Sequence, residues 1–245
     1  MDKTKITWLG HASVKVEFKE LVFYFDPWIE ANPACNLKLE DIKKATAVCV
    51  THGHLDHIGD SIEIVKQTGA KFVCHPGVSW YANKYGIKDG SENSHPLAAG
   101  GSWITDNFTI KMVQAVHTSD IMCEGFKVDE SIEIGSGSVG FVLHLKDGPT
   151  IYFSGDTDVF GDMAIIRDLH CPQIAILTAG GRYNMGYREA AYATALLQPE
   201  YVITTHHGTW PPDQMLDFDQ LEAEMKVRSP KANLVRIKPG ESFEY

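Results

Sequence analysis

Four side chains that can bind a metal ion lie within six consecutive residues of this chain. The run THGHLDHIGD contains His52, His54, Asp56 and His57. Imidazole nitrogens combined with a carboxylate suit zinc, iron or manganese, whereas magnesium and calcium sites are dominated by oxygen ligands. The alternative is a histidine-rich surface turn. So dense a cluster in a chain with eleven histidines favours a transition-metal site.

The spacing within this run indicates how the side chains could divide between two metal ions. Residues two apart in an extended segment point to the same side, so His52 and His54 can hold one ion together. Asp56 and His57 come after the strand, where the turning chain can direct them to a second ion. The run therefore predicts the start of a paired-metal site.

The elements on either side of the run must position it. Residues 45–52 (ATAVCVTH) are typical of a buried strand. Residues 60–69 (DSIEIVKQTG) predict a helix that Asp60 caps and Gly69 ends. Thr51 and Asp60 are interpreted as scaffold residues, one in the strand and the other as the helix cap.

Short apolar segments separated by turn residues recur along the rest of the chain. Strands are predicted at residues 6–10, 12–18, 21–27, 71–75, 108–118, 138–145, 150–156, 173–181 and 201–207, with a final strand pair at 232–238 and 241–245. Helices are predicted at residues 78–86, 163–169, 186–197 and 215–227. Residues 119–138 form a long connection punctuated by glycine, which we interpret as a flap or substrate loop. This alternation predicts an α/β (α+β) chain, and without a repeat or linker we expect one domain over residues 1–245.

Composition limits the possible partners and compartments. A formal net charge of −10 without a basic cluster disfavours nucleic acid and acidic membrane surfaces. Neither a membrane-spanning stretch nor a signal peptide is visible, so we expect a cytoplasmic protein. The five cysteines are scattered and lack CxxC spacing, which argues against a disulfide framework and a thiolate zinc site. We expect a small-molecule substrate, and a homo-oligomer is compatible with the sequence.

Several motifs together resemble one family. The HxHxDH pattern of residues 52–57 is the signature of the metallo-β-lactamase superfamily. TWLGHASV (residues 7–14), DPW (26–28), FSGDT (153–157) and HHGTWP (206–211) are similar to the small bacterial metal-dependent hydrolases related to ascorbate-phosphate lactonases. The resemblance covers nearly the whole chain, and its specificity lies in the order of the motifs. It implies a four-layer αββα sandwich, the metallo-β-lactamase fold, with the metals at one edge of the two sheets.

The resemblance also implies a ligand set. The first ion would be bound by three histidines, the second by a carboxylate and two histidines, and a further aspartate would bridge the two. These residues are His52, His54 and His117 for the first ion, Asp56, His57 and His206 for the second, and Asp156 as the bridge. A hydrogen-bonded histidine at a strand end is the alternative for His117, and a turn or helix cap is the alternative for Asp156.

His206 and His207 compete for the last ligand position. Strand alternation allows only one of them to face the metals, and comparison with the family's motif favours His206. His207 would then line the pocket or donate a proton to the leaving group, with a solvated turn histidine as the alternative. Farther out, Asp26 and His11 resemble positions beside the metals, where Asp26 would orient a ligand histidine or cap the turn before Pro27.

The implied chemistry is hydrolysis. Two divalent transition-metal ions, zinc first and manganese or iron as alternatives, would lower the pKa of a shared water and supply a metal-bound hydroxide. Asp56 would orient the nucleophile or take its proton, and His207 would be the acid. The substrate would contain an ester, lactone, phosphoester or related bond, and Arg182 could hold an anionic group.

Two other functions compete with hydrolysis. An iron-dependent oxidoreductase can have the same fold, but di-iron relatives usually carry a glutamate where this chain has His54. A non-catalytic metal-binding protein is the other alternative, and the intact ligand set argues against it.

Overall fold

Two large β-sheets form the centre of the molecule, for which the computed structural model describes residues 2–121 and 133–245. The first sheet has the strand order β15-β1-β2-β3-β4-β5 and the second the order β14-β13-β12-β11-β10-β7-β6. The first comprises β1 (Thr4–Gly10), β2 (Ser13–Phe18), β3 (Leu21–Phe25), β4 (Ala47–Val50), β5 (Lys71–Cys74) and β15 (Ser242–Glu244). The second comprises β6 (Ser102–Ile104), β7 (Phe108–Gln114), β10 (Val139–Leu145), β11 (Thr150–Phe153), β12 (Ile174–Thr178), β13 (Tyr201–Thr205) and β14 (Asn233–Val235).

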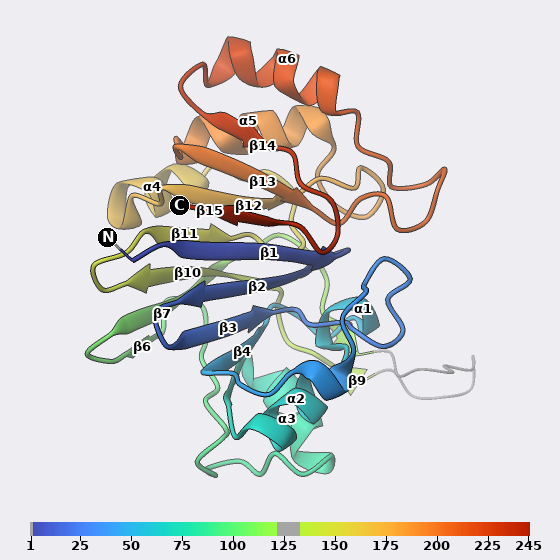
Figure 1. Cartoon of the computed structure of the whole chain (residues 1–245), viewed down its shortest axis with the longest axis vertical. Helices are drawn as coiled ribbons and strands as arrows, with labels where there is room; N and C mark the ends of the chain where they lie inside the picture. Colours follow the sequence, from blue (N-terminus) through green and yellow to red (C-terminus); the bar gives the residue numbers. More distant parts are fainter. Residues whose placement is uncertain (1, 122–132) are drawn as a thin grey trace.

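Helices cover the outer faces of both sheets. Figure 1 shows α2 and α3 at one end of the molecule and α4, α5 and α6 at the other. The helices are α1 (Leu55–Ile58), α2 (Ser61–Thr68), α3 (Pro76–Lys84), α4 (Met163–His170), α5 (Tyr187–Leu197) and α6 (Phe218–Arg228), with a short 3₁₀ turn η1 (Leu39–Asp41). A small ribbon of β8 (Asp120–Ile121) and β9 (Glu133–Ile134) lies beside them. Within the described residues no helix is both long and apolar enough to cross a bilayer.

The continuous apolar runs of the strands are explained by burial on both faces of each sheet. In β3, Phe23 and Phe25 point into the central core between the sheets, and Tyr24 points into the core beneath α2 and α3. In β10, Phe141 belongs to the central core and Val142 to the core beneath α4, α5 and α6. This alternation gives three apolar layers between four structural layers, which confirms the αββα sandwich.

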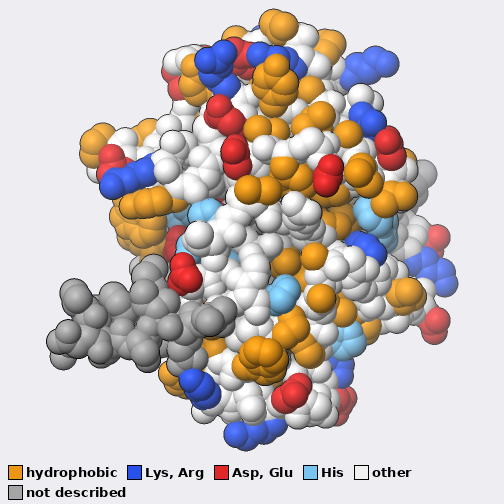
Figure 2. Space-filling model, turned by 180° about the vertical axis from the view of Figure 1, so that it is seen from behind, with side chains coloured by type: hydrophobic (Ala, Val, Ile, Leu, Met, Phe, Trp, Pro, Cys, Tyr) orange, Lys and Arg blue, Asp and Glu red, His pale blue; other side chains and the backbone are white. Residues whose placement is uncertain are grey.

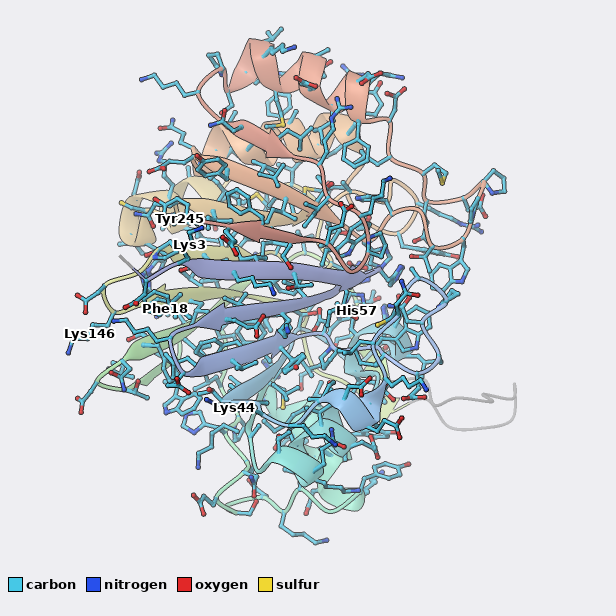
Figure 3. The ribbon with its side chains drawn as sticks, viewed as in Figure 1. Lys3, Phe18, Lys44, His57, Lys146 and Tyr245 are labelled. Atoms are coloured by element: carbon cyan, nitrogen blue, oxygen red, sulfur yellow. The ribbon has the colours of Figure 1, made fainter. Side chains whose placement is uncertain are left out.

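The strand directions place several chain segments at one edge. β3 and β4 are parallel, as are β11, β12 and β13, and β7 runs in the same direction as β11 because both are antiparallel to β10. Ligands in such sheets bind beyond the carboxyl ends of the strands. Figure 3 shows His57 at this edge, whereas Lys3 and Tyr245 lie at the opposite one.

Some sequence expectations are wrong in detail. The two final strands do not pair with each other, because β14 adds to β13 in the second sheet and β15 adds to β1 in the first. Asp60 precedes α2 but does not cap it through its side chain; its carboxylate accepts bonds from the Ile29 and Glu30 amides instead. Gly69 ends that helix in the left-handed conformation, as predicted. The proposed flap at residues 119–138 lies in large part outside the described residues.

Candidate metal centre

Three histidines from two strand ends form the first cluster. His52 and His54 follow β4, and His117 lies three residues beyond the end of β7 rather than within it. Their ligand atoms all lie within 4.8 Å of one another. His52 Nε2 and His54 Nδ1 are 2.9 Å apart, so both nitrogens face the same point. This is the set predicted for the first ion.

A second cluster lies beside the first. His57, on the short helix α1, contributes Nε2, and His206, directly after β13, also contributes Nε2. The Asp56 Oδ2 atom is 3.8 Å from His57 Nε2 and 3.5 Å from His206 Nε2. The residues predicted for the second ion are therefore also brought together.

Asp156 lies between the two clusters. Its Oδ2 atom is 3.8 Å from His117 Nε2, 3.6 Å from His57 Nε2 and 3.0 Å from His206 Nε2. Its position depends on Gly155, which has φ +57° and whose missing Cβ would lie 2.6 Å from Thr51 Cγ2. A side chain at position 155 would therefore displace both the turn that carries Asp156 and the residue before His52.

Buried nitrogens without partners show that this donor set fits a cation. His57 Nε2 and His117 Nε2 are both buried, and neither has a hydrogen-bond partner in the structure. A buried polar atom without a partner costs about 1–3 kcal/mol. Imidazole nitrogens facing carboxylate oxygens are a suitable environment for a divalent transition metal. The residues present therefore fit metal binding.

The protonation preferences agree with this interpretation. Burial lowers the pKa of His52, His54 and His117, so these imidazoles are neutral, the form that binds metal. Burial also acts to lower the pKa of His206, but the carboxylates of Asp156 and Asp56 outweigh it and raise that pKa to about 9. The carboxylate side of the site thus attracts positive charge, which divalent ions would supply.

A buried network behind the predicted ligands fixes the orientation of two histidines. His57 Nδ1 donates to Asp26 Oδ2 over 2.7 Å, and the same carboxylate accepts bonds from the Thr51 amide and hydroxyl. Thr51 Oγ1 is 2.9 Å from His52 Nδ1. Because both Nδ1 atoms are engaged, both Nε2 atoms remain available to a cation. Asp26 therefore orients a histidine predicted to be a metal ligand, and Thr51, interpreted from the sequence as scaffold only, also contacts one.

His11 supports the second cluster from the first sheet. It lies after β1, and its Nε2 is 2.8 Å from Asp56 Oδ2 while its Nδ1 is 2.8 Å from Thr209 Oγ1. Burial and the nearby His206 lower the pKa of His11 to about 4, so the imidazole is neutral. The arrangement is consistent with the Thr209 hydroxyl donating to Nδ1 and Nε2–H donating to Asp56.

The backbone at His206 explains why this histidine reaches the site. His206 has a left-handed φ of 63°, so strand alternation ends at Thr205. Its amide donates to the carbonyl of His11 over 2.8 Å. Gly180 permits this path, because a Cβ there would lie 2.3 Å from the His206 carbonyl oxygen.

The structure does not bring His207 to the metal centre. Its Nε2 is 3.0 Å from Thr204 Oγ1, and its ring packs 4.7 Å from Trp8 and 5.3 Å from Phe218 between ring centroids. Burial lowers the pKa of His207 to about 4, so it carries no proton to donate as an imidazolium at neutral pH. The expected acid role has no geometric support, because the turn at His206 directs the next side chain away from the cleft.

A cleft of about 560 Å³ opens onto the two clusters. In Figure 2 histidine and hydrophobic side chains lie together at the left edge of the molecule. The cleft is lined by Trp28, His54, Leu55, Asp56, His117, Thr118, Asp156, Arg182, Tyr183, His206, Trp210, Asp213 and Gln214. Among these lining residues, sequence reasoning singled out the predicted metal ligands and Arg182. It missed Asp213 and Gln214, which have no motif of their own, although Thr209 and Trp210 stand inside the HHGTWP motif.

Comparisons with known proteins agree with the geometry. The sequence model of the beta-lactamase superfamily domain matches residues 22–207. The UPF0173 metal-dependent hydrolase of Koribacter versatilis is 38% identical over 240 residues, covering 98% of this chain and 97% of the relative. That of Pyrococcus furiosus is 39% identical over 243 residues, covering 98% and 99%. The solved structure of Igni18, a metallo hydrolase from the hyperthermophilic archaeon Ignicoccus hospitalis, matches with a TM-score of 0.82 at 30% identity, covering 99% of this chain and 98% of that one. The chain therefore belongs to the beta-lactamase superfamily and, within it, to the UPF0173 metal-dependent hydrolases.

Proposed function

We propose that the protein hydrolyses an ester, lactone, phosphoester or related bond of a small molecule with two divalent transition-metal ions, zinc being the first candidate. The observation that carries this proposal is the position of Asp156. Its Oδ2 atom lies within 4 Å of ligand nitrogens from both clusters, as a residue shared by two ions must.

The ligands divide between the ions as follows. His52 Nε2, His54 Nδ1 and His117 Nε2 would hold the first ion, and Asp56, His57 and His206 the second. Asp156 would contact both. Ions bound there would lower the pKa of water and would stabilise negative charge on a polarised carbonyl or phosphoryl group.

The protein's own residues would position the reacting groups. Asp56 lines the cleft, and the bond from His11 holds one of its carboxylate oxygens. It is the carboxylate best placed to orient the attacking water or to accept its proton. Burial would raise the pKa of Asp56, but the nearby His57 and the bonds from His11 and His206 hold it well below its usual range, so the carboxylate is ionised.

Replacement of the shared carboxylate tests the proposal. We expect Asp156→Ala to lose bound metal and turnover, measured by elemental analysis and by hydrolysis of chromogenic esters, lactones and phosphodiesters after loading with zinc or manganese. Asp158→Ala is the matched control, because Asp158 lies on the same turn but is exposed. Full metal occupancy with unchanged activity in Asp156→Ala would contradict the assignment. Stoichiometric iron with a visible absorption band, in protein purified without added metal, would favour oxidation chemistry instead.

A further inference from the structure

An aromatic wall lines the cleft beside the metal centre. The rings of Trp28 and Trp210 have centroids 5.6 Å apart, and both pack against His11, at 5.4 Å and 4.7 Å. Trp28 is buried, but Trp210 exposes 41% of its surface and Tyr183 exposes 57%. Large apolar side chains exposed together in a concave site are typical of a surface that a ligand covers. The contacts with His11 hold the tryptophans in place before a ligand arrives.

The charge at the mouth of the cleft is balanced. Arg182 is the only lysine or arginine among the described residues that line the cleft, and its Nη1 is paired with Asp213 Oδ2. Both side chains are about half exposed, so this ion pair contributes little to stability. Its effect is on recognition, because a substrate anion that approaches Arg182 also meets the carboxylate of Asp213.

One buried polar group in the cleft offers a neutral contact. Gln214 lines the cleft and exposes 5% of its surface, and its Oε1 is buried without a hydrogen-bond partner in the structure. The amide oxygen only accepts hydrogen bonds, so it suits an N–H or O–H group of a ligand. It has nothing to donate to the oxygens of a carboxylate or phosphate, so this atom favours an uncharged ligand over an anion.

We infer that the cleft selects uncharged esters or lactones with an aromatic ring, which stacks on Trp210, and that Asp213 disfavours anionic substrates by neutralising Arg182. This inference rests on the proposed hydrolase function and narrows its range of bonds. Any bound ions would carry their own positive charge and would contact the bond that is cleaved. The side chains farther from the ions would contact the rest of the substrate and so decide which substituents are accepted. Phosphoesters and substrates with a carboxylate would be the poorer class.

Three matched lactones test the aromatic contact. Dihydrocoumarin contains a benzene ring fused to the lactone, δ-valerolactone lacks that ring, and a dihydrocoumarin carboxylic acid adds a negative charge. In the metal-loaded enzyme, Trp210→Ala should lower the ratio of kcat/KM for dihydrocoumarin to kcat/KM for δ-valerolactone by about tenfold, as expected from the loss of ring contact. The ratio cancels any loss that both lactones share because the contact of Trp210 with His11 is missing. Trp80→Ala is the control, because Trp80 is 64% exposed on α3 and lies outside the cleft.

The charge argument has its own variants. Asp213→Asn should raise kcat/KM for the carboxylic acid by about fivefold, the size expected for one released charge near the surface, without changing that for dihydrocoumarin. Arg182→Gln combined with Asp213→Asn should abolish the gain. Asp219→Asn is the control and should have no effect, because Asp219 lies on α6 and its exposed ion pair with Arg236 is outside the cleft.

The outcomes separate the two proposals. Two results would overturn the substrate class and leave the hydrolase function intact. One is an equal fall in kcat/KM for both uncharged lactones in Trp210→Ala. The other is an unchanged kcat/KM for the carboxylic acid in Asp213→Asn. Absence of metal-dependent hydrolysis of all three lactones and of simple esters and phosphodiesters would overturn both.

Discussion

His11 Nε2 lies 2.8 Å from Asp56 Oδ2, although the two residues are 45 positions apart in the sequence. The bond fixes the carboxylate oxygen that also faces His57 and His206. We predict that His11→Gln weakens binding of the second ion or lowers kcat by about 10- to 100-fold, the usual effect of losing a group that orients a ligand. Metal titration and the pH profile of kcat would measure it.

Thr209→Val is a milder variant that tests the same hydrogen-bonded chain. It removes the hydroxyl partner of His11 Nδ1 but leaves the bond to Asp56 in place, so a smaller loss is expected. If His11→Gln had the same metal affinity and the same pH profile of kcat as the wild type, the positioning role of His11 would be ruled out.

The buried carboxylate of Asp26 supports a second prediction. Asp26→Asn keeps the shape of the side chain but removes the negative charge of the carboxylate that accepts the hydrogen bond from His57 Nδ1. We expect metal affinity to fall by about 10- to 100-fold. Asp60→Asn is the control, because Asp60 accepts backbone bonds from Ile29 and Glu30 and contacts no histidine among the interactions described. If both variants reduced stability alike and neither changed metal affinity, Asp26 would be only structural.

The adjacent histidines His206 and His207 give the third prediction. His206→Ala should lose one bound ion per chain, whereas His207→Ala should keep both ions. The second variant should instead lower the free energy of unfolding by about 2–4 kcal/mol, because it leaves a cavity between Trp8 and Phe218. Elemental analysis and chemical denaturation distinguish the two effects. Loss of metal in His207→Ala with retention in His206→Ala would reverse the assignment.

A histidine pair far from the metal centre predicts acid sensitivity. His144 Nε2 and His170 Nδ1 are 3.2 Å apart, and burial lowers the pKa of both side chains. The unfolded chain therefore binds protons at these sites at a higher pH than the folded one, so the free energy of unfolding falls as pH drops below about 6.5. His144→Gln combined with His170→Gln should show a shallower fall. Denaturation at pH 7.5 and 5.5, in chelator so that metal loss does not contribute, measures the difference; identical slopes would contradict it.

The part of the candidate site within residues 52–57 was predictable from the sequence, because its four side chains stand at fixed short spacing and the structure brings them together with the others. His117, Asp156 and His206 come from distant strand ends, so only their resemblance to family motifs indicated them. The argument from alternation at His206 and His207 assumed that the strand continued. The left-handed residue at position 206 ends the strand there, and the backbone bond to His11 that accompanies this turn is not visible in local sequence.

The fold was predictable to a similar depth. Apolar runs such as residues 47–50 and 174–178 indicated buried strands, since side chains facing two cores must be apolar on both faces. Sheet order was not, because periodicity carries no information on which strands pair. The placement of β14 and β15 in different sheets shows this, since the two segments are close in sequence and equally short.

The walls of the cleft are separate from the scaffold that holds the ligands. Tyr183 lies between β12 and α5, and Trp210 and Asp213 lie between β13 and α6, so none of the three belongs to a strand. Substitutions at Tyr183, Trp210 and Asp213 therefore leave the sheets in place, provided that Gly180, His206 and Thr209 in the same two loops are kept. For directed evolution, this means that saturation mutagenesis at these three positions can change the substrate preference without rebuilding the proposed metal centre.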